Sequence, residues 1–163
     1  MTFGDILSLR LYTMKILLAT DGTKQSDAAV EMLRNFRLTD KDTVKIVSVV
    51  EMAVPLAIDV YGGYLPDTTE IEKAARDNAT RVLDAAITTA KGIGAPAEVT
   101  GEVLYGSPES QIVETAETFA ADLIILGSHG YNRWERLLLG SVSNSIMHHA
   151  PCSVLVVRSA TEK

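Results

Sequence analysis

Short apolar runs alternate with longer stretches of helical periodicity, and this alternation most constrains how the chain can fold. Five runs rich in Val, Ile and Leu lack the polar–apolar alternation of a strand with one face in water. They span Lys15–Ala19, Val44–Val50, Ala97–Leu104, Ala121–Leu126 and Cys152–Val157. A strand–helix–strand order requires parallel strands joined by right-handed crossovers. The sequence therefore predicts an α/β fold, an open five-stranded parallel sheet with helices on both faces.

Four helices are predicted between these runs. Residues suited to a helix start stand at Ser26, Asp67, Ser107 and Ser141. Helical spacing predicts an inward stripe in the second helix at Ile71, Ala75, Ala79, Val82, Ala86 and Ala90, and one in the third at Ile112, Val113, Ala116, Phe119 and Ala120. The fourth helix must end before Pro151, because the residue preceding a proline avoids helical angles.

Length, charge and cysteine content limit the class of protein. A chain of 163 residues fits one domain, predicted over residues 14–160, with residues 1–13 as a leader that is either disordered or not the native start. A net charge of −6 argues against general binding to nucleic acid or anionic membrane. No apolar run reaches the roughly 18 residues that span a bilayer. Cys152 is the single cysteine, which favours a cytoplasmic location and an apolar filling role for its side chain.

Three glycines frame the segment that follows the fourth apolar run. Gly127, Gly130 and Gly140 are expected to adopt backbone angles closed to other residues and to let a ligand approach the main chain. The helix starting at Ser141 offers unpaired N–H groups and a positive dipole end, and the hydroxyls of Ser141 and Ser143 add donors. The segment predicts a phosphate site. Alternatively, these glycines and serines serve only a turn and a helix cap.

A resemblance to a known family favours the first interpretation. The spacing Gly127-x2-Gly130-x9-Gly140-Ser141, with the segments KILLATDGTKQSDAAV, ADLIILGSHG and LLLGSVSNSIMHHAPCSVLVVR, resembles the ATP-binding subgroup of the universal stress protein family. The likeness extends over residues 14–158. It implies a Rossmann-like fold of the adenine nucleotide alpha hydrolase type and an ATP site.

The resemblance also assigns residues to the nucleotide. They are Ala19, Asp21, Val49, Leu126, Gly127, His129, Gly130, Gly140, Ser141, Val142 and Ser143. Asp21 is expected beside the ribose or adenine and as a ligand of Mg²⁺ held through the phosphates, or else it only braces the turn after the first strand. Val49 is expected against adenine. Ala19 and His129 depart from the proline and arginine frequent in the family, so one permanent cation is missing.

The function implied is a nucleotide-dependent regulatory protein of the stress response that takes ATP as its ligand. The alternatives are a slow ATP hydrolase and a sensor of AMP or cyclic AMP. No catalytic residue is predicted, because the chain has no Walker lysine and no evident pair of metal-holding carboxylates. The resemblance further implies a homodimer through Ser153–Val157 and an unidentified protein partner.

For several charged and aromatic side chains, and for one long connection, the sequence allows two roles. Arg133 and Arg136 are either solvated or able to reach bound phosphates, and Trp134 is either a loop anchor or part of a partner surface. The connection Glu51–Pro66 is either a flap or simply mobile. The pair His148-His149 is expected to favour the helix dipole and not to share a metal ion, because adjacent helical residues diverge.

Overall fold

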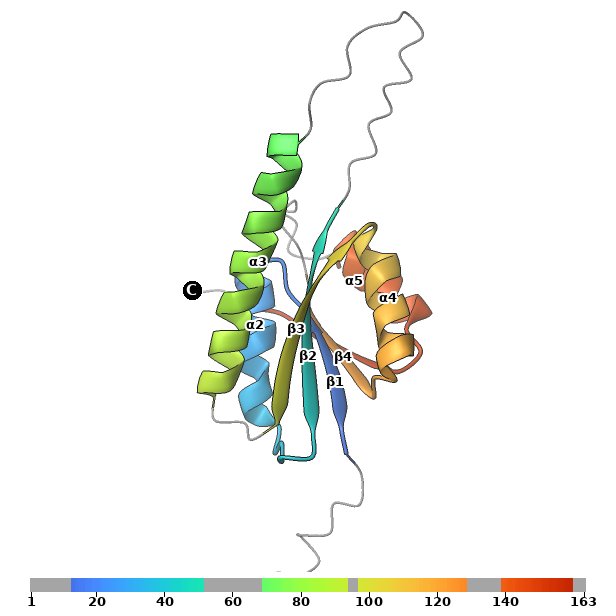
Figure 1. Ribbon diagram of the computed structural model, residues 1–163. Coiled ribbons are helices and arrows are strands. Elements are labelled where there is room, and N and C mark those ends of the chain that lie inside the picture. Colours follow the sequence, from blue (N-terminus) through green and yellow to red (C-terminus); the bar gives the residue numbers. More distant parts are fainter. Residues whose placement is uncertain (1–12, 52–68, 94–96, 129–138, 160–163) are drawn as a thin grey trace, which may run out of the picture.

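The computed structural model describes residues 13–51, 69–93, 97–128 and 139–159. Its centre is a parallel five-stranded sheet in the order β3-β2-β1-β4-β5 (Figure 1). The strands are β1 (Lys15–Ala19), β2 (Thr43–Val50), β3 (Glu98–Tyr105), β4 (Leu123–Gly127) and β5 (Ser153–Val157). The open parallel sheet expected from the apolar runs is confirmed.

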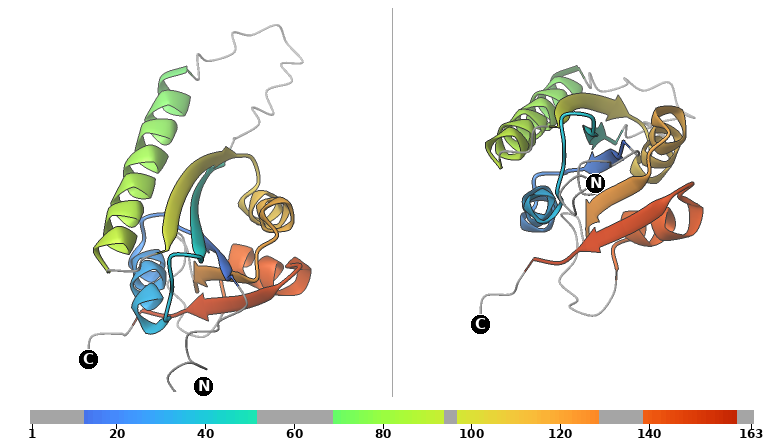
Figure 2. Two further views of the ribbon diagram at one scale, coloured as in Figure 1. Left: turned by 60° about the horizontal axis from the view of Figure 1, so that its bottom comes forward. Right: turned by 90° about the horizontal axis from the view of Figure 1, so that it is seen from below.

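Helices cover both faces of the sheet, as predicted. On one face lie α2 (Lys24–Glu31), the 3₁₀ turn η1 (Met32–Asn35) and α3 (Thr69–Gly92), and on the other lie α4 (Pro108–Phe119) and α5 (Ser141–His149) (Figures 1 and 2). From β1 the chain proceeds outward to β2 and β3, and then returns through α4 to β4 on the other side of β1. The connections therefore diverge between β1 and β4, where open α/β sheets bind ligands.

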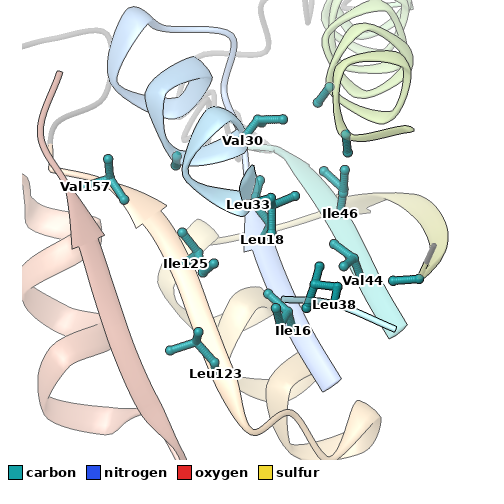
Figure 3. Close-up of a cluster of buried hydrophobic side chains, with 14 of the residues drawn as sticks. Ile16, Leu18, Val30, Leu33, Leu38, Val44, Ile46, Leu123, Ile125 and Val157 are labelled. Carbon is teal, nitrogen blue, oxygen red and sulfur yellow. The ribbon is translucent and has the colours of Figure 1, made fainter. Parts of the chain in front are cut away.

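Two apolar layers hold the helices to the sheet. The layer under α2 and α3 includes Ile16 and Leu18 of β1, Ile46 of β2 and Leu33 of η1, all essentially inaccessible to water (Figure 3). The opposite layer contains Leu17, between the two β1 residues just named, with residues of α4 and α5. Both sides of the central strands are thus buried, which explains their continuous apolar sequence. Each such side chain contributes roughly 1.5–3 kcal/mol on burial.

The edge strand β3 departs from the expectation of burial on both faces. All of its residues are half-buried or exposed, and Val99 and Val103 pack against the layer under α3. Gly101 lies between them on the same face, where a Cβ atom would come within 2.4 Å of the Ile87 side chain. The uneven burial follows from the position of β3 at the end of the sheet.

The inward stripes of α3 and α4 were predicted with an error at one end of each helix. Ile71 is 72% exposed, because the first turns of α3 extend past the edge of the sheet (Figure 1). Leu83, in the middle of α3, was absent from the predicted stripe but is buried. In α4, Ala120 does not cover the sheet but ends the helix in the left-handed region, with φ of 53°.

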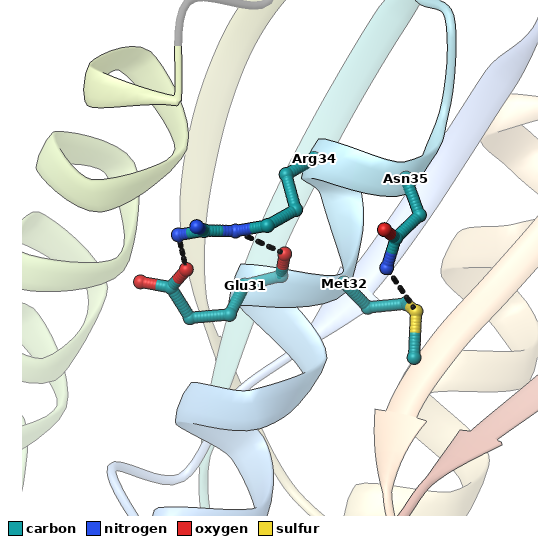
Figure 4. A network of polar contacts seen from close by, with 4 residues as sticks. All are labelled: Glu31, Met32, Arg34 and Asn35. Atoms are coloured by element: carbon teal, nitrogen blue, oxygen red, sulfur yellow. Dashed lines mark hydrogen bonds and ion pairs between the residues drawn. The ribbon is translucent and has the colours of Figure 1, made fainter.

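The end of α2 carries a set of local polar contacts on the surface. The Arg34 guanidinium pairs with the Glu31 carboxylate, and its Nε donates to the Glu31 carbonyl at 3.2 Å. In the same turn, Asn35 Nδ2 lies 3.0 Å from Met32 Sδ (Figure 4). All of these contacts join residues three apart in the turn where the helix narrows to η1, so they stabilise this terminus locally and are worth little individually.

At the amino edge of the sheet a buried carboxylate ties three segments together. Asp42 is 1% exposed and accepts from the Met14 N–H at 2.7 Å and from the Thr39 N–H and hydroxyl at 2.6 and 2.9 Å. The backbone carbonyl of Asp42 accepts from the Glu98 N–H, at the start of β3, at 3.0 Å. The protein's own groups satisfy this carboxylate, as burial of a charge demands. The sequence analysis did not single out Asp42.

Some predictions concern residues outside the described ranges. These are the leader up to residue 12, the connection from residue 52 to Pro66, the capping residue Asp67, and Arg133, Trp134 and Arg136. Among the helices that the structure describes, none combines the length and apolarity needed to cross a bilayer.

Candidate functional site

The described site residues gather at the carboxyl edge of the sheet around β1. Ala19, the last residue of β1, pairs with Leu126 of β4 on one side and with Val47 of β2 on the other. Val49 lies two residues beyond Val47 at the same edge and is half-buried. The structure thus brings together Ala19, Val49 and Leu126, which are far apart in the sequence. His129 and Gly130 lie outside the described residues.

The turn after β1 is braced by the carboxylate that the sequence singled out. Asp21 Oδ1 accepts from the Thr23 N–H at 3.0 Å and from the Thr23 hydroxyl at 2.7 Å. Within the described part of the chain, no hydrogen bond uses Asp21 Oδ2. Gly22 between them has φ of 77° and lies so close to α3 that a Cβ atom would meet Val82 Cγ2 at 2.7 Å. The turn is fixed, and one carboxylate oxygen remains as an acceptor.

Thr23 caps α2, not Ser26 as predicted. Thr23 has an extended backbone, and its Oγ1 accepts from the Ser26 N–H at 3.3 Å. Ser26 lies in the third helical position, where its buried hydroxyl donates to the Thr23 carbonyl at 2.9 Å. The start of α2 is therefore satisfied by the protein itself. An Asp-x-Thr sequence before a helix is the signal that could have identified this turn.

Gly127 and Gly140 do not have the special backbone angles expected of them. Gly140 has φ of −62°, and among the described glycines only Gly22 and Gly106 have positive φ. A Cβ atom at Gly127 would lie 2.8 Å from the carbonyl carbon of Gln25 and 2.9 Å from the Ser26 nitrogen. The space beside Gly127 is thus taken by the first turn of α2, and what requires glycine there is helix packing.

A buried hydroxyl joins the end of β4 to the start of α5. Ser143 is 2% exposed, and its Oγ lies 3.0 Å from the carbonyl oxygens of both Ser128 and Gly140. The Ser128 carbonyl also accepts from the Gly140 N–H at 2.9 Å. The single proton of the Ser143 hydroxyl is directed at these carbonyls. In this arrangement the hydroxyl donates within the protein, and its donation to a phosphate stays a prediction.

The first turn of α5 begins with N–H groups for which the described part of the chain offers no acceptor. Gly140, the residue before the helix, has no side chain to cap it, and the first intrahelical bond runs from the Asn144 N–H to the Gly140 carbonyl at 2.9 Å. None of the hydrogen bonds of the described residues uses the N–H groups of Ser141, Val142 or Ser143. With the positive end of the helix dipole, these groups form an arrangement suited to an anion.

The histidines of α5 and the single cysteine contact neighbouring groups of the protein itself. The Nδ1 atoms of His148 and His149 lie 2.8 Å from carbonyls of the preceding turn, in keeping with the predicted role at the helix end. No cluster of three metal-ligating side chains occurs within the described ranges. Cys152 is half-buried just before β5, and burial, reinforced by the nearby Asp122 charge, raises the pKa of its thiol. A thiol kept protonated is a poor nucleophile, as expected of an apolar filler.

Comparisons with known proteins agree with this architecture. The model of the universal stress protein family matches residues 13–158. A Staphylococcus aureus (strain USA300) protein assigned to the universal stress proteins is 34% identical over 145 residues, which cover 88% of this chain and 83% of the relative. The solved universal stress protein UspA from Lactobacillus plantarum is 24% identical with a TM-score of 0.71, covering 89% of this chain and 97% of its own.

A further solved relative, from Arabidopsis thaliana with AMP bound, is 16% identical with a TM-score of 0.63, covering 91% of this chain and 93% of its own. At this identity the likeness establishes the fold alone. The family model, in contrast, extends from just before β1 to just after β5, and the S. aureus relative matches most of the same span. The chain belongs to the universal stress protein family.

Proposed function

We propose that this protein binds ATP at the carboxyl edge of the sheet between β1 and β4, and that nucleotide occupancy regulates its activity in a cytoplasmic stress response. The observation that carries the proposal is the first turn of α5, whose three leading N–H groups have no acceptor among the described residues. This turn follows the strand that neighbours β1 at the topological switch point. Solved universal stress proteins bound to AMP, cAMP and dAMP support the ligand class.

The charges at the site indicate which end of the nucleotide would face α5 and which would face Asp21. The phosphates would face the N–H groups of Ser141, Val142 and Ser143, because an anion gains most from unpaired donors and the positive end of a helix. The free oxygen of Asp21 would accept from a sugar hydroxyl, since a carboxylate repels phosphate. Adenine would then lie toward Val49 on β2. Ala19 and Leu126 form the paired strand ends beneath the ligand.

The number of phosphates distinguishes ATP from AMP and cyclic AMP as the proposed ligand. A triphosphate carries more charge for the α5 donors than AMP or cyclic AMP, which favours ATP. Histidine in place of arginine at position 129 favours the smaller ligands. In the alternative role of Asp21, its free oxygen would bind Mg²⁺ instead of the sugar. The ion would be held mainly by the phosphates, because Mg²⁺ usually takes one or two carboxylates together with phosphate oxygens.

Titration calorimetry with ATP, ADP, AMP, cyclic AMP and adenosine, with and without Mg²⁺, tests the proposal. We expect affinity to rise with the number of phosphates. Absence of binding by all five compounds would refute nucleotide binding, and preference for cyclic AMP or AMP would identify the sensor alternative.

A proline substitution tests the α5 donors directly. Ser141→Pro removes one N–H at the first helical position, where proline is well tolerated and where α4 already carries Pro108. The extended backbone of Gly140, with ψ of 157°, suits a residue before proline. ATP affinity should fall about tenfold, the equivalent of ~1.4 kcal/mol for a charged hydrogen bond. Ser141→Ala, which keeps the N–H, is the control and should lose less.

The hydrolase alternative is tested by phosphate release from ATP and Mg²⁺. The proposed regulatory role predicts turnover far below the median enzyme rate of about 10 per second. Release at several per second would establish an ATPase instead.

We also propose a homodimer through Ser153–Val157. The strand β5 lies at an edge of the sheet, and its central residues Val154, Leu155 and Val156 are half-buried in the single chain. An apolar edge strand invites pairing with another chain, and a two-fold axis would pair it with its own copy. Sedimentation equilibrium should give twice the mass of the 163-residue chain. A monomer at micromolar concentration would contradict this assignment.

A further inference from the structure

The hydroxyl of Ser143 connects the first turn of α5 to the sheet. Ser128, just past β4, is 2% exposed and donates its N–H to the Val157 carbonyl of β5 at 2.8 Å. The Ser128 carbonyl then accepts from the Gly140 N–H at 2.9 Å and lies 3.0 Å from Ser143 Oγ. The Gly140 N–H and the Ser143 hydroxyl therefore converge on the carbonyl of Ser128, a residue whose N–H bonds to the edge strand β5.

This connection differs from an ordinary helix cap in its direction. A capping side chain accepts from the N–H groups of the second or third helical residue and so consumes them. Ser143, in the third position of α5, donates to the carbonyls of Ser128 and Gly140. The helix start is thus fixed without use of the N–H groups of Ser141, Val142 or Ser143.

We propose that Ser143 is a positioning residue for the nucleotide phosphates: its hydroxyl holds the α5 donors at the end of β4 and does not itself contact the ligand. This inference depends on the proposed nucleotide binding. Donors held in place before binding need not be ordered by the ligand, which is the origin of the affinity gained from a preorganised site.

Removal of the hydroxyl should loosen this turn without unfolding the protein. In Ser143→Ala the Ser128 carbonyl keeps the Gly140 N–H, and the Gly140 carbonyl keeps the Asn144 N–H. Each of the two carbonyls thus keeps one hydrogen-bond donor. The variant therefore avoids the large loss of stability that an unsatisfied buried polar group would cause.

Calorimetry with ATP and with adenosine distinguishes positioning from general stability. Ser143→Ala should bind ATP about five- to tenfold more weakly, the equivalent of one ordinary hydrogen bond, and adenosine with nearly unchanged affinity. Ser145→Ala is the matched control, because it removes the same atom from the same helix. Among the described residues, the Ser145 hydroxyl has its one side-chain contact with His149 Nδ1, at 3.5 Å. This control should bind both ligands as the native chain does.

The outcomes separate the two proposals. If the native protein binds no nucleotide, the proposed function fails. If the native protein binds ATP and Ser143→Ala keeps the same ratio of ATP to adenosine affinity, the positioning role alone is refuted, whether both affinities are unchanged or both fall. Should Ser143→Ala fail to fold, Ser143→Cys offers a similar size with a weaker donor. It should show the same selective loss of ATP affinity, and native affinity for both ligands in that variant would overturn the inference.

Discussion

The starts of α2 and α5 differ in how the protein uses their backbone N–H groups. Both helices follow neighbouring strands, β1 and β4, at the carboxyl edge of the sheet. The start of α2 is capped by Thr23, whose side chain accepts from the Ser26 N–H. The start of α5 follows Gly140, which has no capping side chain. One helix start is therefore closed by the protein, and the other keeps its donors.

The comparison teaches that a helix start has two possible uses, and that its preceding residue decides between them. A threonine cap stabilises the helix by about 1 kcal/mol, but it occupies a donor. A glycine gives up only a few tenths of a kcal/mol of helix stability and leaves the donors for an anion. In α5 the Ser143 hydroxyl recovers part of the stability from the carbonyl side.

The largest expected effect concerns the contact between α2 and β4. In Gly127→Ala the new Cβ atom would collide with the backbone of Gln25 and Ser26, at 2.8 and 2.9 Å. Because backbone cannot rotate away, the free energy of unfolding in urea should fall by about 3 kcal/mol. Gly92→Ala is the control, since nothing lies within 4 Å of its added Cβ. Equal stability of the two variants would show that α2 does not require glycine at position 127.

The second prediction concerns a substitution that gives α5 a capping side chain, as α2 has. In Gly140→Asp the carboxylate should accept from the free N–H groups of the first turn and repel phosphate. Compared with Gly140→Ala, which adds only a Cβ atom, the aspartate variant should bind ATP about a hundredfold more weakly, or ~2.7 kcal/mol. It should also be more stable than the alanine variant by about 1 kcal/mol. Equal ATP affinity of the two would contradict an anion site at this helix.

The smallest expected effect comes from opening the α2 start. Thr23→Ala removes the cap on Ser26 and a hydrogen bond to Asp21, so the free energy of unfolding should fall by about 1 kcal/mol. Thr23→Ser keeps the hydroxyl and should restore most of this loss. A new phosphate site should not appear at α2, because Asp21 stays beside it. Tighter phosphate binding by Thr23→Ala in calorimetry would show that the cap alone distinguishes the two helices.

The sequence predicted the sheet closely and the local contacts poorly. All five apolar runs became strands. For the central strands the reason is burial on both faces, which requires an apolar composition. Ile71 was placed wrongly, since helical periodicity does not reveal where a helix leaves the sheet. The hydrogen bonds of the Ser143 hydroxyl to two carbonyls were missed for a similar reason, because a serine near a helix start can donate equally to a ligand or to the chain.

The sequence by itself determined the parallel α/β fold, the edge of the sheet at which the candidate site residues lie, and the family resemblance, because these depend on periodicity and on spacing along the chain. Tertiary structure decided which donors remain free. Gly127 serves the packing of α2, and the Ser143 hydroxyl is taken up by the Ser128 carbonyl. These outcomes depend on contacts between segments far apart in the sequence, whose geometry no local pattern encodes.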